Sequence, residues 1–320
     1  VYKRQTLLRL RSQHRLAVVE LGMNHPGEIA GLATMAQPTV ALVNNAQREH
    51  LEFMHTVEAV ARENGTVIAA LPPQGVAVFP LDDDYTAIWT DLAGMRSTVQ
   101  FGWTSAGAAQ EVLCTGADWV DGAWQVRVST PWGPLAYRLS IAGRHNVKNS
   151  LAAAACALAA GVNTQAVEQG LQAFVPVKGR CRAQLLTHSG LHCTLVDDTY
   201  NANPDSMRAA IQVLVDLPGP RLLVLGDMGE VGTRGAEFHA EVGRLAHASG
   251  ITHVLALGEL ARHAVQACPG AEHFADVDTL IARARTLLPQ MASVLVKGSR
   301  FMRMERCLLY TSDAADERSS

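Results

Sequence analysis

Several apolar runs in this chain end directly on a charged or polar side chain. In an open parallel sheet the carboxyl ends of the strands meet at one edge, where ligands bind, so such endings are candidates for chemistry. Four runs end in this way, on Glu20, the pair Asp197 and Asp198, Asp227, and Lys297, and a fifth, VALVNN (40–45), leads to His50. So many endings of this kind predict a shared polar cleft, and its carboxylates make it compatible with Mg²⁺.

Each of these residues also has an ordinary structural explanation. Glu20 could cap the helix that follows it, and His50 could be a surface histidine. Asp197 and Asp198 precede TYNANP (199–204), where turn chemistry and a helix start explain part of the pattern. Two aspartates and two asparagines exceed what a turn needs, so this segment favours binding.

Two further segments carry weaker signals. GRHN (143–146) opens an Ala-rich helix, and a helix N-terminus binds anions or hydrogen-bonding rings, although Asn146 as a plain N-cap is the simpler explanation. GDMGEVG (226–232) is glycine-rich, but its spacing is not that of a dinucleotide fingerprint, which disfavours an NAD dehydrogenase. The phosphate-binding pattern G-x-x-x-x-G-K-[ST] does not occur in the sequence.

Short β-branched runs alternate with helical patterns, which is typical of parallel α/β architecture. We predict strands over 17–21, 40–44, 66–70 and 76–79, helices over 26–36 and 146–160, and an antiparallel hairpin over 119–140. The pattern breaks around 175–179, and a second series follows. It has predicted strands over 191–196, 221–226, 253–257 and 293–296, and helices over 204–215, 236–249 and 277–288, which suits a doubly wound sheet.

The composition excludes several classes of protein. Of 320 residues 48% are hydrophobic and 18% charged, so the chain can bury a large core and is not disordered. The net charge of −3, without a Lys/Arg cluster, disfavours a nucleic-acid partner, and no apolar run is long enough to span a bilayer. The six cysteines include no Cys-x-x-Cys pair, so we expect reduced thiols in a cytoplasmic protein.

Six segments resemble the Mur ligases, a family of ATP-dependent amide-bond-forming enzymes of peptidoglycan synthesis. They are VVELGMNHPGEIA (18–30), ALVNNAQREHLEFM (41–54), GRHNVKNSLAAAA (143–155), DDTYNANPDSM (197–207), VLGDMGEVG (224–232) and VLVKGSR (294–300). They follow in order between Thr6 and Arg306. DDTYNANP and GDMGEVG indicate the branch that joins D-Ala-D-Ala to UDP-N-acetylmuramoyl-tripeptide.

The resemblance implies an α/β fold in two parts. A partial central ATPase domain, with a parallel sheet and a small antiparallel hairpin, is placed at 6–176, and a Rossmann-like C-terminal domain at 177–306. We expect 1–5 and 307–320 to be foreign to the family. The phosphate-binding loop of the family would lie before Thr6, so we expect the chain as given to be inactive.

The resemblance also implies the reaction. ATP phosphorylates the terminal carboxylate of the tripeptide nucleotide, and the amine of D-Ala-D-Ala then attacks the acyl phosphate. ATP and Mg²⁺ are the implied cofactors, and we expect a monomer without a nucleic-acid partner or membrane span.

Roles near the metal and the phosphates are carried over residue by residue. Glu20 and His50 match family positions that hold Mg²⁺, which bridges phosphate oxygens and neutralises developing charge. Arg180 matches an arginine that reaches the phosphates, where a planar donor suits a transferring phosphoryl group. His50 and Arg180 are therefore the expected catalytic residues.

Nucleotide and substrate roles fall on other residues. His145, Asn146 and Asn149 match the adenine-side motif, with the two amides one helical turn apart, so that both can face one pocket. Asp198 matches a ribose-binding carboxylate. Asn201 and Asn203 are expected to shape the cleft that closes on substrate.

One departure and two alternatives remain. Asn64 stands where many members carry a carbamylated lysine, so a second Mg²⁺ is either held differently here or bound more weakly. The chain could instead be a sister amide ligase, such as another Mur ligase or a folylpolyglutamate synthetase. It could also be a non-catalytic nucleotide-binding remnant that kept the fold.

The metal assignment predicts an effect of His50→Ala in the full-length protein. Loss of an imidazole ligand should weaken Mg²⁺-dependent turnover, because the phosphate charges are then less well neutralised. The measurement is activity across a Mg²⁺ titration. An unchanged titration curve would remove His50 from the metal shell.

Overall fold

The computed structural model describes residues 7–48, 51–103, 111–120, 122–188, 191–229 and 231–308. The chain divides into two compact units, which are described separately. Unit 1 consists of Val1–Thr115, Arg127–Leu135 and Lys148–Glu168, and unit 2 of Gly116–Val126, Ala136–Val147 and Gln169–Ser320. In the described part of the chain no helix is both long and apolar enough to cross a membrane.

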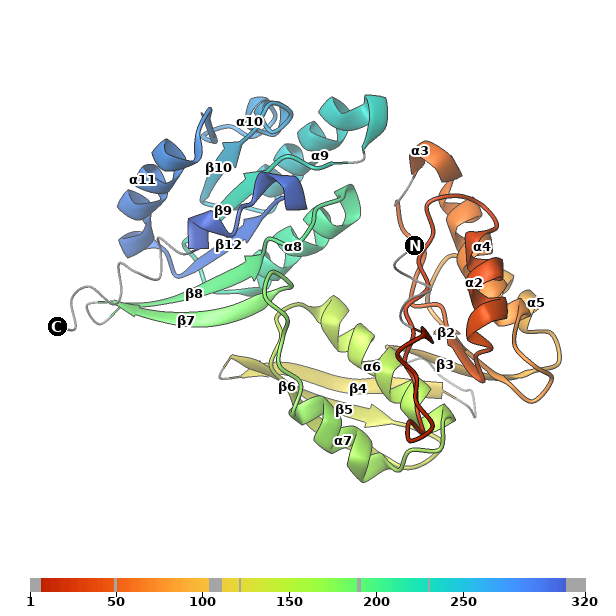
Figure 1. Ribbon diagram of the computed structural model, residues 1–320. Helices are drawn as coiled ribbons and strands as arrows, with labels where there is room; N and C mark the ends of the chain where they lie inside the picture. Colours follow the sequence, from red (N-terminus) through yellow and green to blue (C-terminus); the bar gives the residue numbers. More distant parts are fainter. Residues whose placement is uncertain are drawn as a thin grey trace. The chain divides into compact units, whose positions relative to one another are not determined.

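The first sheet has six strands in sequence order (Figure 1). They are β1 (Val40–Leu42), β2 (Val76–Pro80), β3 (Ser97–Trp103), β4 (Glu111–Val120), β5 (Ala123–Ser129) and β6 (Leu135–Leu139). The pairs from β1 to β4 are parallel, and a short turn that contains Pro131-Trp132-Gly133 joins β5 to β6. The helices of this half are α2 (Glu28–Ala36), α3 (Leu51–Met54), α4 (Val57–Ala69), α5 (Thr86–Ala93), α6 (Arg144–Ala159) and α7 (Thr164–Gln172).

Buried polar contacts join the helices of unit 1. Glu63 on α4 is 7% exposed and accepts hydrogen bonds from the backbone N–H groups of Gly27 and Ile29, which lie at the start of α2. A carboxylate there satisfies N–H groups that the helix itself leaves unpaired. The indole of Trp89 on α5 is fully buried and donates to the carbonyl of Ala61 on α4. These bonds therefore orient α2 and α5 against α4.

The second sheet has the order β11-β10-β9-β12-β8-β7. Its strands are β7 (Arg182–His188), β8 (Leu191–Asp198), β9 (Arg221–Gly226), β10 (His253–Leu257), β11 (Glu272–Phe274) and β12 (Ser293–Lys297). All neighbours are parallel except β7 and β8. The helices are α8 (Pro204–Asp216), α9 (Gly235–Ala248), α10 (Arg262–Gln266) and α11 (Val277–Leu287), with short 3-10 turns at Gly232–Arg234, Leu288–Gln290 and Arg300–Met302.

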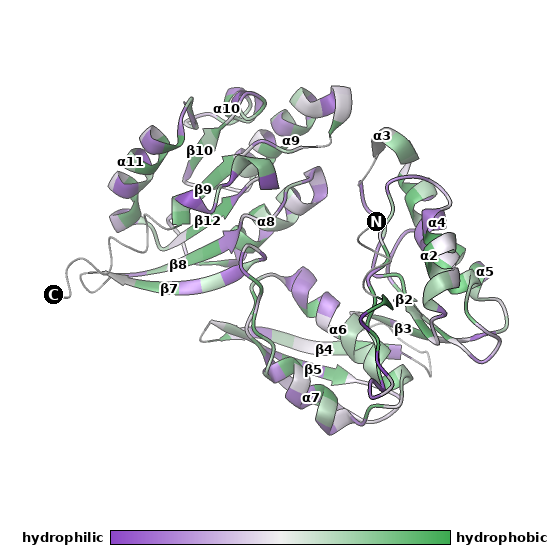
Figure 2. Cartoon of the chain, in the orientation of Figure 1, coloured by the Kyte–Doolittle hydropathy of each residue, from purple (hydrophilic) through white to green (hydrophobic). Residues whose placement is uncertain are grey.

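Successive residues of the central strands serve opposite faces of this second sheet. Leu223 and Leu225 of β9 belong to the core with α8 and α9, whereas Leu222 and Val224 belong to the core with α11. Both faces are covered by helices, so the central strands are apolar over most of their length, and Figure 2 draws much of them in green. The predicted doubly wound second series is therefore confirmed, as is the α/β class.

Two predicted strands of the first half are wrong. Residues 66–70 lie in α4 and its end, because Val60, Ala61, Val67 and Ile68 are buried at helical spacing and their β-branched character is overridden. Residues 17–21 form no strand in the structure, and Val18 is fully exposed. β1, the edge strand of the described sheet, pairs with β2 and not with this segment. The boundary at 176–177 stays a prediction.

The contact between α9 and α10 generates a test. A Cβ at Gly243 on α9 would collide with the backbone carbonyl of Ala264 on α10, so Gly243→Ala must push the helices apart. We expect a loss of about 1–3 kcal/mol in the free energy of unfolding, measured by urea denaturation. The control is Gly170→Ala on α7, where no atom lies within 4 Å and alanine should stabilise by about 0.5–1 kcal/mol. Equal effects would contradict the close packing.

Candidate functional site

The polar residues of unit 2 gather at the carboxyl ends of β8 and β12. The register pairs Lys297 with Asp198, and Lys297 Nζ lies 2.7 Å from Asp198 Oδ2. The ammonium also donates to the carbonyl of Asn201 at 2.8 Å. Lys297 is 3% exposed, so its charge is held inside the protein by these two contacts. The predicted gathering of strand-end side chains is thus present for β8 and β12.

Asp198 is shared with the segment before β7. Its Oδ1 accepts the backbone N–H of Cys181 at 3.1 Å, and the Cys181 Sγ lies 3.8 Å from His145 Nε2. Burial raises the pKa of the Cys181 thiol to about 12 and lowers the pKa of His145 below its usual 6.5. The thiol is therefore protonated and the imidazole neutral at neutral pH, which excludes a thiolate–imidazolium nucleophile here.

Asp197 ties the same two segments together. Its Oδ2 accepts the N–H of Gly179 at 2.8 Å, and its Oδ1 accepts the hydroxyl of Thr199 at 2.7 Å. Gly179 has φ of +81°, and a side chain there would press on the backbone of Tyr200. The next residue, Arg180, is exposed, with its guanidinium 4.1 Å from the centre of the Tyr200 ring. Arg180 is thus presented on a backbone that both aspartates brace.

The two asparagines of this segment, Asn201 and Asn203, make hydrogen bonds that hold the local structure. Asn203 is the N-cap of α8, where its side chain accepts the N–H of Ser206 and the Ser206 hydroxyl accepts the N–H of Asn203. Asn201 contributes its backbone carbonyl to Lys297. Their expected substrate role stays a prediction.

The glycine-rich segment after β9 is built on a buried histidine. Met228 N–H donates to His239 Nε2 at 2.9 Å, so the proton of the neutral ring is on Nδ1, which donates to the carbonyl of Gly235. Asp227 accepts the N–H of Ala261 at 2.7 Å. His239 is fully buried, and its pKa is lowered mainly by that burial. Asp227 and His239 therefore shape the loop after β9.

The amides of α6 have separate partners. In unit 1 the Asn44 Nδ2 donates to Asn149 Oδ1 at 2.9 Å. In unit 2 the Asn146 Nδ2 donates to the carbonyl of Ala142, and α6 begins at Arg144. The simpler explanation of Asn146 as an N-cap is therefore wrong, because it lies inside the first turn.

The predicted metal ligands are not brought together among the described residues. Glu20 is exposed in a segment without regular structure, and His50 lies outside the described residues. Over the described ranges no group of three or more His, Cys, Asp or Glu side chains is placed to hold a metal. Asn64 lies on α4 in unit 1.

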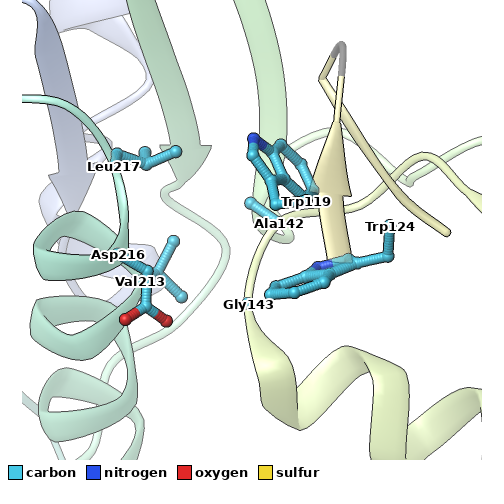
Figure 3. A pocket seen from close by; sticks show the side chains of 7 residues that line it. All are labelled: Trp119, Trp124, Ala142, Gly143, Val213, Asp216 and Leu217. Carbon is cyan, nitrogen blue, oxygen red and sulfur yellow. The ribbon is translucent and has the colours of Figure 1, made fainter. Parts of the chain in front are cut away.

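A small cavity of about 40 Å³ lies in unit 2 (Figure 3). The side chains of Val213 on α8 and of Leu217, which follows α8 directly, face the indoles of Trp119 and Trp124 across it. The Trp124 indole N–H is buried without a hydrogen-bond partner in the described structure. A space of this size admits only a few waters, so it is not a substrate pocket.

Sequence reasoning missed the roles of three residues in this site. Lys297 was noted as a strand ending, but its partner follows only from the β8–β12 register. Tyr200 and Cys181 gave no signal, because the contacts of each depend on a segment 17 or more residues away. A lysine at the end of an otherwise apolar strand was the one available clue.

Comparison with known proteins identifies the class. The Mur ligase middle domain matches residues 2–157, and the Mur ligase glutamate ligase domain matches residues 181–300. The two matches follow one another along the chain in this order. The chain belongs to the Mur ligase family.

Individual members of the family show how similar this chain is to known ligases. UDP-N-acetylmuramoyl-tripeptide–D-alanyl-D-alanine ligase of Escherichia coli is 39% identical over 303 residues, which cover 94% of this chain and 66% of the relative. MurF from Acinetobacter baumannii superposes with a TM-score of 0.85 at 35% identity, covering 97% of this chain and 67% of that one. MurF from Thermotoga maritima in complex with ADP gives 0.81 at 25% identity, covering 94% and 67%. The chain thus spans just under two-thirds of the length of its E. coli relative.

The buried His239 predicts a pH dependence of stability. Its pKa in the folded protein lies below the unfolded value of 6.5, so the unfolded state binds the extra proton on acidification. The contribution of the neutral His239 to the free energy of unfolding should therefore be fully present above about pH 6.5, and it should be lost as the pH falls below that value. We expect a smaller loss in His239→Gln, whose amide oxygen can accept the Met228 N–H without titrating. The check is urea denaturation at pH 8 and 5.5; equal losses would contradict it.

Proposed function

We propose that this chain is part of an ATP-dependent ligase that joins D-Ala-D-Ala to UDP-N-acetylmuramoyl-tripeptide. One observation carries the proposal: the E. coli ligase of that name matches 94% of the chain at 39% identity. The same similarity supports cytoplasmic peptidoglycan synthesis as its setting, and we propose a monomer.

The reaction places defined demands on the residues. ATP transfers its γ-phosphoryl group to the terminal carboxylate of the tripeptide, and the amine of D-Ala-D-Ala displaces phosphate from the acyl phosphate. Charge builds up on the transferring group, so a fixed cation beside it lowers the barrier. Arg180 suits this role, because it is exposed, always charged and stacked on Tyr200.

The described residues also fit a nucleotide. Asn44 Oδ1 is buried and has no hydrogen-bond partner in the described structure, although its amide nitrogen is bonded to Asn149. Such an orphaned acceptor demands a donor. The exocyclic amino group of adenine is a donor of the right kind, which supports Asn149 at the adenine side. His145 and Asn146 remain proposed there, and Asp198 at the ribose.

The described residues do not provide a complete set of ligands for Mg²⁺. Glu20 alone supplies one exposed carboxylate, and the proposed partner His50 lies outside the described ranges. Bound Mg²⁺ would neutralise phosphate charge. Glu20 and His50 stay the proposed ligands on the strength of the resemblance.

Phosphate release tests the proposal in the full-length protein that carries this chain. We expect release to require ATP, the tripeptide nucleotide and D-Ala-D-Ala together, because the acyl phosphate is consumed only by the amine. Single amino acids and glutamate offered as acceptors are the controls, since a sister Mur ligase or a folylpolyglutamate synthetase would use them. Release without D-Ala-D-Ala dependence would reject the assignment. Absence of turnover with retained ADP binding would instead favour a non-catalytic remnant.

A further inference from the structure

Lys297 is a charge in the interior of the second sheet. It is the last residue of β12, which lies between β8 and β9, and its side chain is 3% exposed. An ammonium group at this depth is retained only if it is paired and hydrogen-bonded, because its desolvation is otherwise too costly. The burial of the Lys297 ammonium group therefore needs a structural or functional explanation.

Both contacts of the ammonium lie on one segment. Nζ is 2.7 Å from Asp198 Oδ2 and 2.8 Å from the carbonyl oxygen of Asn201. Asp198 ends β8, and Asn201 lies three residues further along, in the connection to α8. One cation therefore holds the carboxylate and the start of this connection in a single geometry.

The same carboxylate reaches a second segment. Asp198 Oδ1 accepts the N–H of Cys181, which follows Arg180 directly. The carboxylate cannot rotate to serve Lys297 differently without losing this bond. Lys297 is thus coupled, through Asp198, to the backbone that presents Arg180.

Two features separate Lys297 from a substrate-binding residue. Its side chain is nearly inaccessible, and its two hydrogen bonds are to protein groups. The Asp198 side chain keeps 13% of its surface exposed and can still accept a further donor. The lysine therefore acts through the aspartate.

We propose that Lys297 is a positioning residue for the nucleotide: it orients the Asp198 carboxylate and the 198–201 turn, and with them Arg180, for binding ATP. This inference rests on the proposed function. Loss of the Lys297 ammonium weakens nucleotide binding and leaves the affinity for the acceptor amine largely unchanged.

The test is a graded series in the full-length protein: Lys297→Arg, Lys297→Gln and Lys297→Met. Arginine keeps the charge, glutamine keeps a hydrogen-bond donor, and methionine keeps only the length. ADP affinity is measured by calorimetry, and KM for ATP and for D-Ala-D-Ala is measured with kcat. We expect ADP affinity and KM for ATP to worsen in that order, by about tenfold or more for methionine. KM for D-Ala-D-Ala should change less than twofold.

Arg208→Met is the matched control. Arg208 pairs with Glu241 in the same unit, but the pair is exposed and far less coupled, so its loss should leave both affinities unchanged. If Lys297→Met does not fold, the arginine and glutamine variants still decide the order. Unchanged ADP affinity across folded variants overturns the inference, and so does an equal change in both KM values.

The outcomes separate this inference from the proposed function. If the wild-type protein binds ADP but shows no D-Ala-D-Ala-dependent phosphate release, the proposed function is rejected. The ADP affinities of the Lys297 variants still test the inference. If turnover is normal and the series is flat, only the inference fails. A wild-type protein that does not bind ADP overturns both.

Discussion

Two neighbouring parallel strands of the second sheet, β8 and β12, end on opposite charges that the fold has taken out of water. Lys297 and Asp198 are mutually dependent, because removing one partner of a buried pair typically costs about 3–5 kcal/mol through the charge left behind. The pair also holds the register, since a slip of one residue would leave Lys297 and Asp198 on opposite faces of the sheet. The geometry of the polar edge follows from this single contact.

From that pair, hydrogen bonds extend along the ends of three strands. The Ser299 hydroxyl, two residues after Lys297, donates to the carbonyl of Ala202 and accepts the N–H of Gly229. The connections after β8, β9 and β12 are thereby linked. Because the polar groups satisfy one another, they are held in place before any ligand binds, which is the condition for strong electrostatic effects on a transferring group. The exposed Arg180 and the partly exposed Asp198 are among the groups that this edge still offers to solvent.

Membership of the Mur ligase family gives this edge its context. The matches to the middle and glutamate ligase domains fall on the two halves in sequence order. In the first half, the orphaned acceptor of Asn44 beside Asn149 is one polar feature that a packed core does not explain. In the second half, the sheet edge around Asp198 is the corresponding feature. Both halves therefore carry polar groups that the packing of the core does not explain.

The second α/β series was predictable from the sequence, because apolar strands buried on both faces and amphipathic helices leave strong local patterns. Two strand predictions failed in the first half. A β-branched run at 66–70 became helix because its neighbours are buried at helical spacing, and 17–21 carries no regular structure. By itself the sequence determined the fold class, the family and the polar strand ends. Only the tertiary structure decided which ends meet: the Lys297–Asp198 pair depends on a strand register across 99 residues, and no local pattern encodes it.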